Sequence, residues 1–320
     1  MKVITCFSYK GGAGRTVAAS NIAAALASVR EGGAVTAALN RRVALLDLDV
    51  FSAGTHRTFG ISNEELKSNL PVSIQDYLLE EMHPQTFFEK GGVRPDNPLM
   101  HSFYRECGGA EGCDPGFTLF PARPDPEGFA VQKLHEHLLL DLVEELEGKQ
   151  GFDYLIIDGE NGIRSMASIA LRLADVVLVF FRLTWQHIEG SQATVADWIK
   201  NNLATPFYLV PTVVPLVAPD DPIYKPRAPG INVLREQTRL IPEGSGLNEQ
   251  CAAHREPCGY GSFWCRPDDK DGPLCVHESL VLKGGERVVV FDPDPEIRRD
   301  RVASDYYRIA AELNRVHPPR

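Results

Sequence analysis

The residues whose types and spacing could do chemistry first appear in the segment Ser8–Thr16, SYKGGAGRT. Its glycines let successive backbone N–H groups point into one concavity, where they can bind phosphate oxygens. Thr16 supplies a hydroxyl suited to Mg²⁺. A standard phosphate-binding loop ends in Gly-Lys-Thr, whereas this chain has Arg15 before Thr16. Arginine keeps the charge and can donate to phosphate in a forked geometry, so the loop predicts phosphate binding and leaves the hydrolysis rate open.

The alternative for this segment is a tight glycine turn between a strand and a helix, with no ligand. Three aspartates argue against it, because Asp47, Asp49 and Asp158 stand at the ends of apolar runs that read as strands. Ligands of open α/β sheets bind beyond the carboxyl ends of the strands. Carboxylates there can hold Mg²⁺ through water and orient an attacking water, although buried aspartates can also merely cap helices. We favour the nucleotide site.

Apolar runs alternate with amphipathic segments along the chain, which predicts a doubly wound, mostly parallel α/β sheet of three layers, Rossmann-like in architecture. We expect one domain over residues 1–320, with irregular insertions at about 84–116 and 216–285, and a loop at 51–70. The predicted strands are residues 3–7, 42–49, 117–122, 152–158, 176–181, 206–214 and 287–292, and the predicted helices are residues 16–29, 72–81, 131–148, 165–174, 188–203 and 296–316.

The composition is that of a globular protein of 320 residues with a formal net charge of −10. This charge argues against a protein that coats nucleic acid. The first residues lack a signal-peptide layout, and no apolar stretch approaches the roughly 20 residues of a membrane span. An odd number of cysteines, seven, fits a reducing compartment. We therefore expect a cytoplasmic protein without integral membrane association.

Several segments together resemble the ParA/MinD-type ATPases, which belong to the SIMIBI class of P-loop proteins. The lysine before the double glycine is the most specific single mark, and Arg15 resembles a less familiar branch in which arginine fills the lysine position. The segments that carry the resemblance are KGGAGRT (10–16), VALLDLDVFSAG (43–54), LFPARPDPE (119–127), FDYLIIDGENGI (152–163) and ADVVLVFF (174–181).

The resemblance implies a role for each matching residue. Lys10 would reach across an ATP-bound dimer to the partner's phosphates, and Asp49 would position the hydrolytic water. Arg15 would act with both on the transferring phosphoryl group. The nucleotide would lie on Gly11, Gly12, Ala13, Gly14, Arg15, Thr16 and Val17, Mg²⁺ would involve Thr16, Asp47 and Asp158, and Gly162 would lie in a second switch. The chain has no Asn-Lys-x-Asp signature of guanine recognition, which favours ATP over GTP.

The function implied is a slow ATPase that acts as a molecular switch, forming a homodimer on Mg-ATP and signalling to or positioning a protein partner. A non-hydrolysing nucleotide-binding scaffold is the alternative that Arg15 keeps open. A metal-handling ATPase is a third reading, resting on Cys251, Cys258, Cys265 and Cys275 with His254 and His277 nearby. The spacings of these cysteines are wide for a zinc site, so we favour free thiols. The same interpretation is favoured for Cys107 and Cys113.

The last predicted helix, residues 296–316, could dock on a membrane or bind DNA. Its apolar stripe of Val302, Ile309, Leu313 and Val316 is narrow, and packing on the sheet explains it better than insertion into an interface. DNA binding would need exposed arginines, and a solvated helix face is the commoner meaning of such charges. The arginines concerned are Arg298, Arg299, Arg301 and Arg315. Neither membrane docking nor nucleic-acid binding is favoured.

Overall fold

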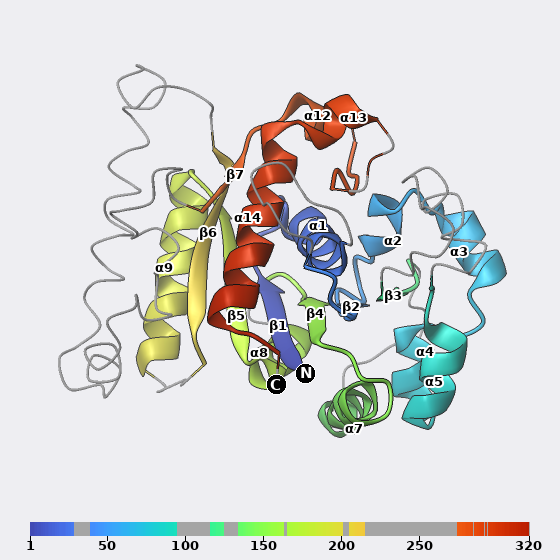
Figure 1. Cartoon of the computed structure of the whole chain (residues 1–320). Coiled ribbons are helices and arrows are strands. Elements are labelled where there is room, and N and C mark those ends of the chain that lie inside the picture. Colours follow the sequence, from blue (N-terminus) through green and yellow to red (C-terminus); the bar gives the residue numbers. More distant parts are fainter. Residues whose placement is uncertain are drawn as a thin grey trace, which may run out of the picture.

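A parallel sheet of seven strands, in the order β3-β2-β4-β1-β5-β6-β7, runs through the computed structural model (Figure 1). The structure describes residues 1–28, 39–94, 116–124, 134–162, 165–200, 205–214, 274–283, 285–290, 292 and 294–319. The strands are β1 Lys2–Phe7, β2 Val43–Asp47, β3 Phe117–Phe120, β4 Tyr154–Asp158, β5 Val176–Arg182, β6 Phe207–Val214 and β7 Val276–His277. This architecture confirms the predicted fold class.

Helices cover both faces of the sheet, which explains why its strands are apolar on both sides. Alternate side chains of a strand point to opposite faces. Ile4 of β1 accordingly packs into the cluster that contains the residues of α1, whereas Val3 packs with those of α7 and α8. Figure 1 shows α1 (Arg15–Ala27) lying against α14 (Arg301–Val316) on one face. The remaining helices of these layers are α4 Ile74–Leu79, α5 Pro84–Gly91, α7 Leu134–Gly148, α8 Ser165–Leu173 and α9 Trp185–Lys200.

The segment expected to be a loop at 51–70 contains two short helices, α2 (Thr55–Thr58) and α3 (Asn63–Asn69), so that prediction is wrong. A capping box begins α3. The Ser62 hydroxyl accepts a hydrogen bond from the backbone of Glu65 at 3.2 Å, and the Ser62 backbone N–H donates to the Glu65 carboxylate at 2.8 Å. The Ser-x-x-Glu spacing is the sequence signature of this cap, and it stands before an apolar residue, Leu66, that is fully buried.

The strand predicted at 287–292 is also wrong. Its valines are buried, but its backbone bonds to helices rather than to a neighbouring strand. The amide of Val288 donates to the carbonyl of Thr58 at 2.9 Å, and the Asn21 side chain binds the carbonyl of Arg287 and the amide of Val290 at 3.0 and 3.2 Å. A run of valines therefore crosses α1 and α2 as irregular chain, and these three backbone groups find their partners on the two helices.

The edge strand β7 and the short helix α12 (Leu280–Lys283) lie within the range predicted as the second insertion. Another short helix, α13 (Pro295–Arg298), precedes α14. Residues 95–115 and 215–273, most of both expected insertions, lie outside the described residues. The single-domain division stays a prediction. Over the part of the chain that is described, no helix is both long and apolar enough to cross a membrane.

Candidate functional site

The loop between β1 and α1 has the backbone geometry of an anion site. Gly12 and Gly14 have φ angles of 78° and 76°, in the left-handed region that glycine adopts without a steric penalty. Gly14 is the N-cap of α1, and no side chain caps this end of the helix. Thr212 of β6 anchors the loop by donating to the carbonyl of Ala13 at 2.7 Å. The loop therefore presents uncapped amides and the positive end of the α1 dipole at one place.

A cavity of about 440 Å³ opens beside this loop. Backbone and side chains of the loop form one wall, and the segment after β2 forms another. The lining residues are Ser8, Gly12, Ala13, Gly14, Arg15, Thr16, Val17, Asp49, Phe51, Ser52, Ala53, Gly54, Arg57, Pro124, Asn161 and Glu286. Of the predicted site residues, most of the glycine loop, Thr16 and Asp49 thus share one cavity, whereas Lys10, Gly11, Asp47 and Asp158 are not among its lining residues.

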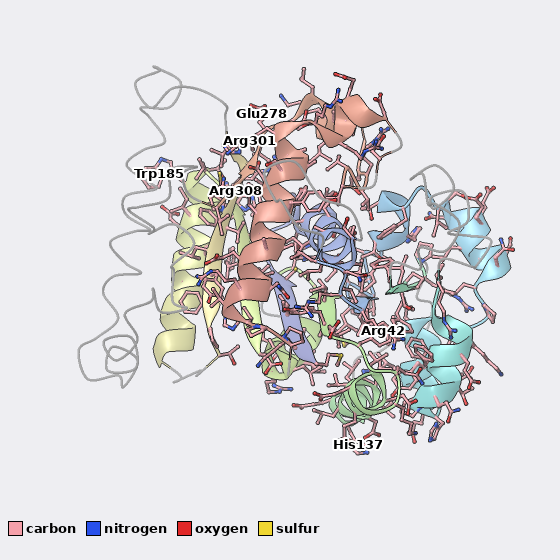
Figure 2. The ribbon with its side chains drawn as sticks, in the orientation of Figure 1. Arg42, His137, Trp185, Glu278, Arg301 and Arg308 are labelled. Carbon is pink, nitrogen blue, oxygen red and sulfur yellow. The ribbon has the colours of Figure 1, made fainter. Side chains whose placement is uncertain are left out.

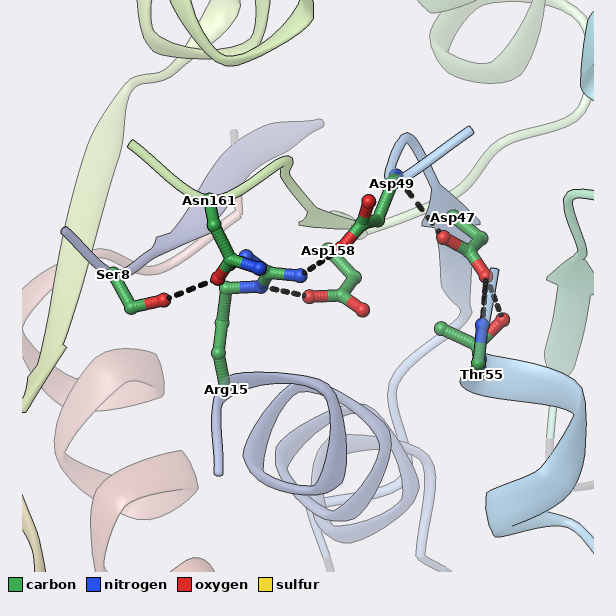
Figure 3. A network of polar contacts seen from close by, with 8 residues as sticks. Ser8, Arg15, Asp47, Asp49, Thr55, Asp158 and Asn161 are labelled. Atoms are coloured by element: carbon green, nitrogen blue, oxygen red, sulfur yellow. Dashed lines mark hydrogen bonds and ion pairs between the residues drawn. The ribbon is translucent and has the colours of Figure 1, made fainter. Parts of the chain in front are cut away.

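Arg15 is 4% exposed and points its guanidinium toward carboxylates at the strand ends (Figure 3). Its Nε donates to Oδ1 of Asp158 at 2.5 Å, and its Nη2 donates to Oδ2 of Asp49 at 2.7 Å. Its Nη1 donates to Oδ1 of Asn161 at 2.7 Å, and that oxygen also accepts from the hydroxyl of Ser8 at 3.0 Å. Arg15 therefore joins the glycine loop to the ends of β2 and β4.

Asp47, at the end of β2, holds the loop that follows it. Its Oδ1 accepts from the amide of Asp49 at 3.1 Å. Its Oδ2 accepts from the amides of Gly54 and Thr55 at 3.3 and 3.2 Å and from the Thr55 hydroxyl at 2.7 Å (Figure 3). Both oxygens of this fully buried side chain are thus engaged by the protein's own donors. Asp47 fixes the path of residues 48–55, which form one wall of the cavity.

Burial and neighbouring charges shift the pKa values of the ionisable side chains at the strand ends. Burial raises the pKa of Asp47, and the charge of Asp158 raises it further. Burial also raises the pKa of Asp158, while the charge of Arg15 opposes that shift. For Arg15 burial favours the neutral form, but Asp158 and Asp49 outweigh it and raise the pKa of the guanidinium. Arg15 is thus a permanent cation paired with two carboxyl groups, those of Asp49 and Asp158.

The carboxylates do not fit a metal ion in this arrangement. Mg²⁺ prefers oxygen ligands in near-octahedral geometry. The Asp47 oxygens are engaged by four N–H and O–H donors, while Asp49 and Asp158 each give one oxygen to Arg15. Oδ2 of Asp158 is buried and has no hydrogen-bond partner among the described residues. Thr16 and Asp49 still line the cavity, but no step is assigned to a metal here.

Lys10 points away from the cavity of its own chain. Its Nζ donates to Oε1 of Gln186, in the first turn of α9, at 2.7 Å on the protein surface. The neighbouring Tyr9 ring lies against Gly190 of the same helix, where an added Cβ would be 2.0 Å from a ring carbon. Trp185, which begins α9, is 56% exposed and lies at that end of the helix (Figure 2). Lys10 therefore lies on a surface shared by the loop and α9.

Sequence reasoning missed the polar residues that complete the site. Asn161 joins Arg15 to Ser8, Thr55 binds Asp47, and Gln186 holds Lys10. The signal for Asn161 was its place three residues after Asp158, on the loop beyond a strand end. Gly162, expected in a second switch, has a φ of 74° and donates to the carbonyl of Ser8 at 3.0 Å, so this loop also contacts the phosphate loop.

The cysteines and histidines considered as metal ligands lie partly inside and partly outside the described residues. Cys107, Cys113, Cys251, His254, Cys258 and Cys265 lie outside the described residues. Cys275 Sγ is 3.7 Å from Nε2 of His277, whose Nδ1 is 2.8 Å from the Asp305 carboxylate. Among the residues that can be described, no three His, Cys, Asp or Glu side chains form a group that could hold a metal ion. Burial raises the pKa of the Cys275 thiol to about 12, which is typical of an inert thiol.

The last helix packs into the protein. Val302, Ile309 and Leu313 are fully buried in the same cluster as α1, which confirms the packing reading of this stripe. The arginines considered for DNA binding have partners of their own. Arg298 donates to the carbonyl of Asp292, Arg299 pairs with Glu296 at 3.1 Å, Arg301 with Asp305 at 3.2 Å, and Arg315 with Glu312 at 2.8 Å.

Comparisons with known proteins show what this chain is similar to in sequence and in fold. The chain is 27% identical, over 208 residues, to the chromosome partitioning protein ParA of Myxococcus xanthus (strain DK1622). The matched part is 63% of this chain and 60% of that relative, so the chain spans less than two thirds of its length. No family model matches the chain.

Solved structures share the fold. The MinD cell division protein of Aquifex aeolicus has a TM-score of 0.57 at 16% identity, with 98% of each chain covered. The cobyrinic acid a,c-diamide synthase of Mycobacterium smegmatis, solved with an ATP analogue and magnesium, has a TM-score of 0.55 at 19% identity, covering 98% of this chain and 95% of that one.

Proposed function

We propose that this chain, a ParA homologue with the fold of the MinD/ParA-type P-loop ATPases, is an ATP-dependent switch that binds and slowly hydrolyses ATP, dimerises on it and signals to a protein partner. One observation carries the proposal. Left-handed Gly12 and Gly14 place uncapped amides of α1 at a cavity that Thr16 and Asp49 also line. Phosphate is the ligand that such a loop recognises.

The residues of the chain suggest how the switch works. The loop amides bind the phosphates and the helix dipole favours their negative charge. Asp49 lines the cavity, where its carboxylate can orient a water toward the terminal phosphate while Arg15 balances its charge. Asp49 and Thr55 are both bonded to Asp47, so a change at Asp49 is passed to residues 48–55. That loop is the element through which a partner reads the nucleotide state.

The contact of Lys10 with α9 supports a proposed role for this residue on a second copy of the chain. Its ammonium lies on α9 rather than in its own cavity, so a dimer facing this surface would bring it to the partner's phosphates. The sandwich of two copies around two nucleotides remains a proposal that this orientation supports. We propose that a further protein receives the signal. The similarity to ParA and MinD indicates this general class of partner.

A second candidate function is a nucleotide-binding scaffold with scarcely any turnover. The ion pair between Arg15 and Asp49 favours it, because a carboxylate held by a buried guanidinium is a weak acceptor for a water proton. ATP would then stabilise one conformation without being consumed. Binding is common to both candidates and turnover separates them.

Calorimetric titration with ATP tests the binding that both candidates need. Gly14→Ala puts a side chain on a left-handed residue of the phosphate loop and is expected to weaken ATP binding by about tenfold or more, since the loop amides must turn. Gly60→Ala is the matched control, because Gly60 has a φ of 75°, open space around its Cβ and no place in the cavity. Equal ATP affinity in the Gly14→Ala and wild-type proteins would contradict the proposal.

A further inference from the structure

The Arg15 guanidinium is paired with carboxylates at the ends of two neighbouring strands of the sheet. It is 4% exposed, and each of its three nitrogens donates to an oxygen acceptor. Two of those acceptors are carboxylates on different strands, Asp49 after β2 and Asp158 at the end of β4. Figure 3 shows the guanidinium between them. A buried charge is stable only when it is paired and hydrogen-bonded, and this pairing supplies both conditions.

An ammonium group could not replace this arrangement. A lysine has one nitrogen at its tip and acts as a point charge, whereas the planar fork of arginine reaches several acceptors in fixed directions. Arg15 uses Nε for Asp158, Nη2 for Asp49 and Nη1 for Asn161. The substitution of arginine for lysine in this loop thus changes which groups at the strand ends carry a counter-charge.

We infer that Arg15 is a built-in cation that replaces a divalent metal ion at Asp49 and Asp158, so that nucleotide phosphate binds here without requiring Mg²⁺. The inference rests on the proposed nucleotide binding and concerns the cation that this site uses. Both carboxylates already have their counter-charge from the chain, and Asp47 has both oxygens bonded to residues 49–55. The phosphates meet loop amides and the end of α1, which belong to the chain as well.

Removing Arg15 would uncover a set of metal ligands. Oδ2 of Asp158 is buried and has no hydrogen-bond partner within the described structure. With the guanidinium gone, Oδ1 of Asp158 and Oδ2 of Asp49 would lose their charged partner as well, and Thr16 lines the same cavity as Asp49. Carboxylate and hydroxyl oxygens are the ligands that hard divalent cations prefer. The inference therefore predicts a metal site in a variant and none in the wild type.

The test is a titration of nucleotide-free protein with Mn²⁺, with free Mn²⁺ followed by electron paramagnetic resonance. Arg15→Gln is expected to bind one Mn²⁺ more than the wild type, and Arg15→Gln/Asp49→Asn to lose that extra ion. Arg57→Gln is the matched control, because Arg57 also lines the cavity but is exposed, and its guanidinium donates to Asn63 at a long 3.4 Å rather than to a carboxylate. Equal Mn²⁺ binding by wild type and Arg15→Gln would overturn the inference.

A second measurement uses the wild-type protein alone and holds even where Arg15→Gln does not fold. ATP affinity is measured by calorimetry in Mg²⁺ and in EDTA. A change below about threefold is expected, and a loss above about tenfold in EDTA would overturn the inference, since phosphate binding would then need the metal. Absence of ATP binding under both conditions would count against the proposed function instead, and the Mn²⁺ titration, which contains no nucleotide, would still decide the role of Arg15.

Discussion

Oδ2 of Asp49 accepts a hydrogen bond of 2.7 Å from Nη2 of Arg15, so the carboxylate predicted to orient water and the cation predicted to bind phosphate are paired with each other. Both side chains are almost fully buried. The residue proposed to orient the attacking water is therefore bonded directly to a residue proposed to bind the phosphate. Turnover therefore requires Asp49 to orient water while it stays paired with Arg15, whereas a nucleotide-binding scaffold has no such requirement.

Arg15→Ala is expected to lower the free energy of unfolding by about 3–5 kcal/mol, because it leaves two buried carboxylates without their cation. Chemical denaturation at neutral pH measures the change. Arg57→Ala removes a positive charge from the same cavity but at an exposed position, and about 0.5 kcal/mol or less is expected from it. Similar losses in the two variants would show that the Arg15 pairs contribute little.

Thr55→Val is expected to lower the free energy of unfolding by about 1–3 kcal/mol, because Oδ2 of the buried Asp47 loses a hydroxyl donor at 2.7 Å. Amide hydrogen exchange at Gly54 and Thr55 should become faster at the same time, since both amides bond to that oxygen. Thr55→Ser keeps the hydroxyl and serves as the control. Unchanged exchange in Thr55→Val would mean that Asp47 does not hold this loop.

Gly190→Ala is expected to destabilise the protein even though alanine is the better helix former by about 1 kcal/mol. The added Cβ would stand 2.0 Å from the Tyr9 ring, and overpacking of this kind costs about 1–3 kcal/mol. Gly148→Ala, at the end of α7, meets no atom within 4 Å and provides the comparison by thermal unfolding. A Gly190→Ala protein at least as stable as Gly148→Ala would place Tyr9 away from α9.

Acid is expected to destabilise the protein partly through His317, which follows α14. Burial, with the charge of Lys2, lowers the pKa of His317 to about 4, and Nε2 of the ring lies 2.7 Å from the Tyr208 hydroxyl. An unfolded histidine titrates near 6.5, so the unfolded state binds more protons between these values. The contribution of His317 is therefore complete above about pH 6.5 and is lost as the pH falls toward 4.

His317→Gln removes that titration. The difference in unfolding free energy between wild type and variant is expected to shrink as the pH is lowered from 7 to 5, by equilibrium denaturation at each pH. Parallel pH profiles would show that His317 titrates alike in the folded and unfolded protein. Carboxylates that titrate in the same range affect both proteins equally and cancel in the difference.

Much of the sheet could be predicted from the sequence because its strands are continuous apolar runs, such as residues 176–181, that need cover on both faces. The positions of the aspartates at the strand ends were also predictable, because each of them closes or directly follows one of these apolar runs. The irregular conformation of the valines at 288–290 could not be predicted, because their hydrogen-bond partners are the side chain of Asn21 and the backbone of α2, which are far away in the sequence. β7 has two residues, too few for a periodic signal.

Some features of the candidate site could likewise be predicted from the sequence, and others could not. The glycine loop between a strand and a helix was predictable because its glycines are adjacent in the chain. The direction of the Arg15 side chain was not, because phosphate and the carboxylates compete for one guanidinium, and only the folded geometry shows Asp49, Asp158 and Asn161 within its reach. The roles of Lys10, Arg15 and Asp49 in turnover stay predictions.

ATP turnover followed together with molecular mass by light scattering, on wild type and Lys10→Ala, tests the central claim most directly. The account predicts that ATP doubles the mass of the wild type and is slowly hydrolysed, and that Lys10→Ala binds ATP but loses both the dimer and turnover. A wild type that binds ATP and shows neither turnover nor a change in mass would contradict the switch and leave the cavity as a structural nucleotide site.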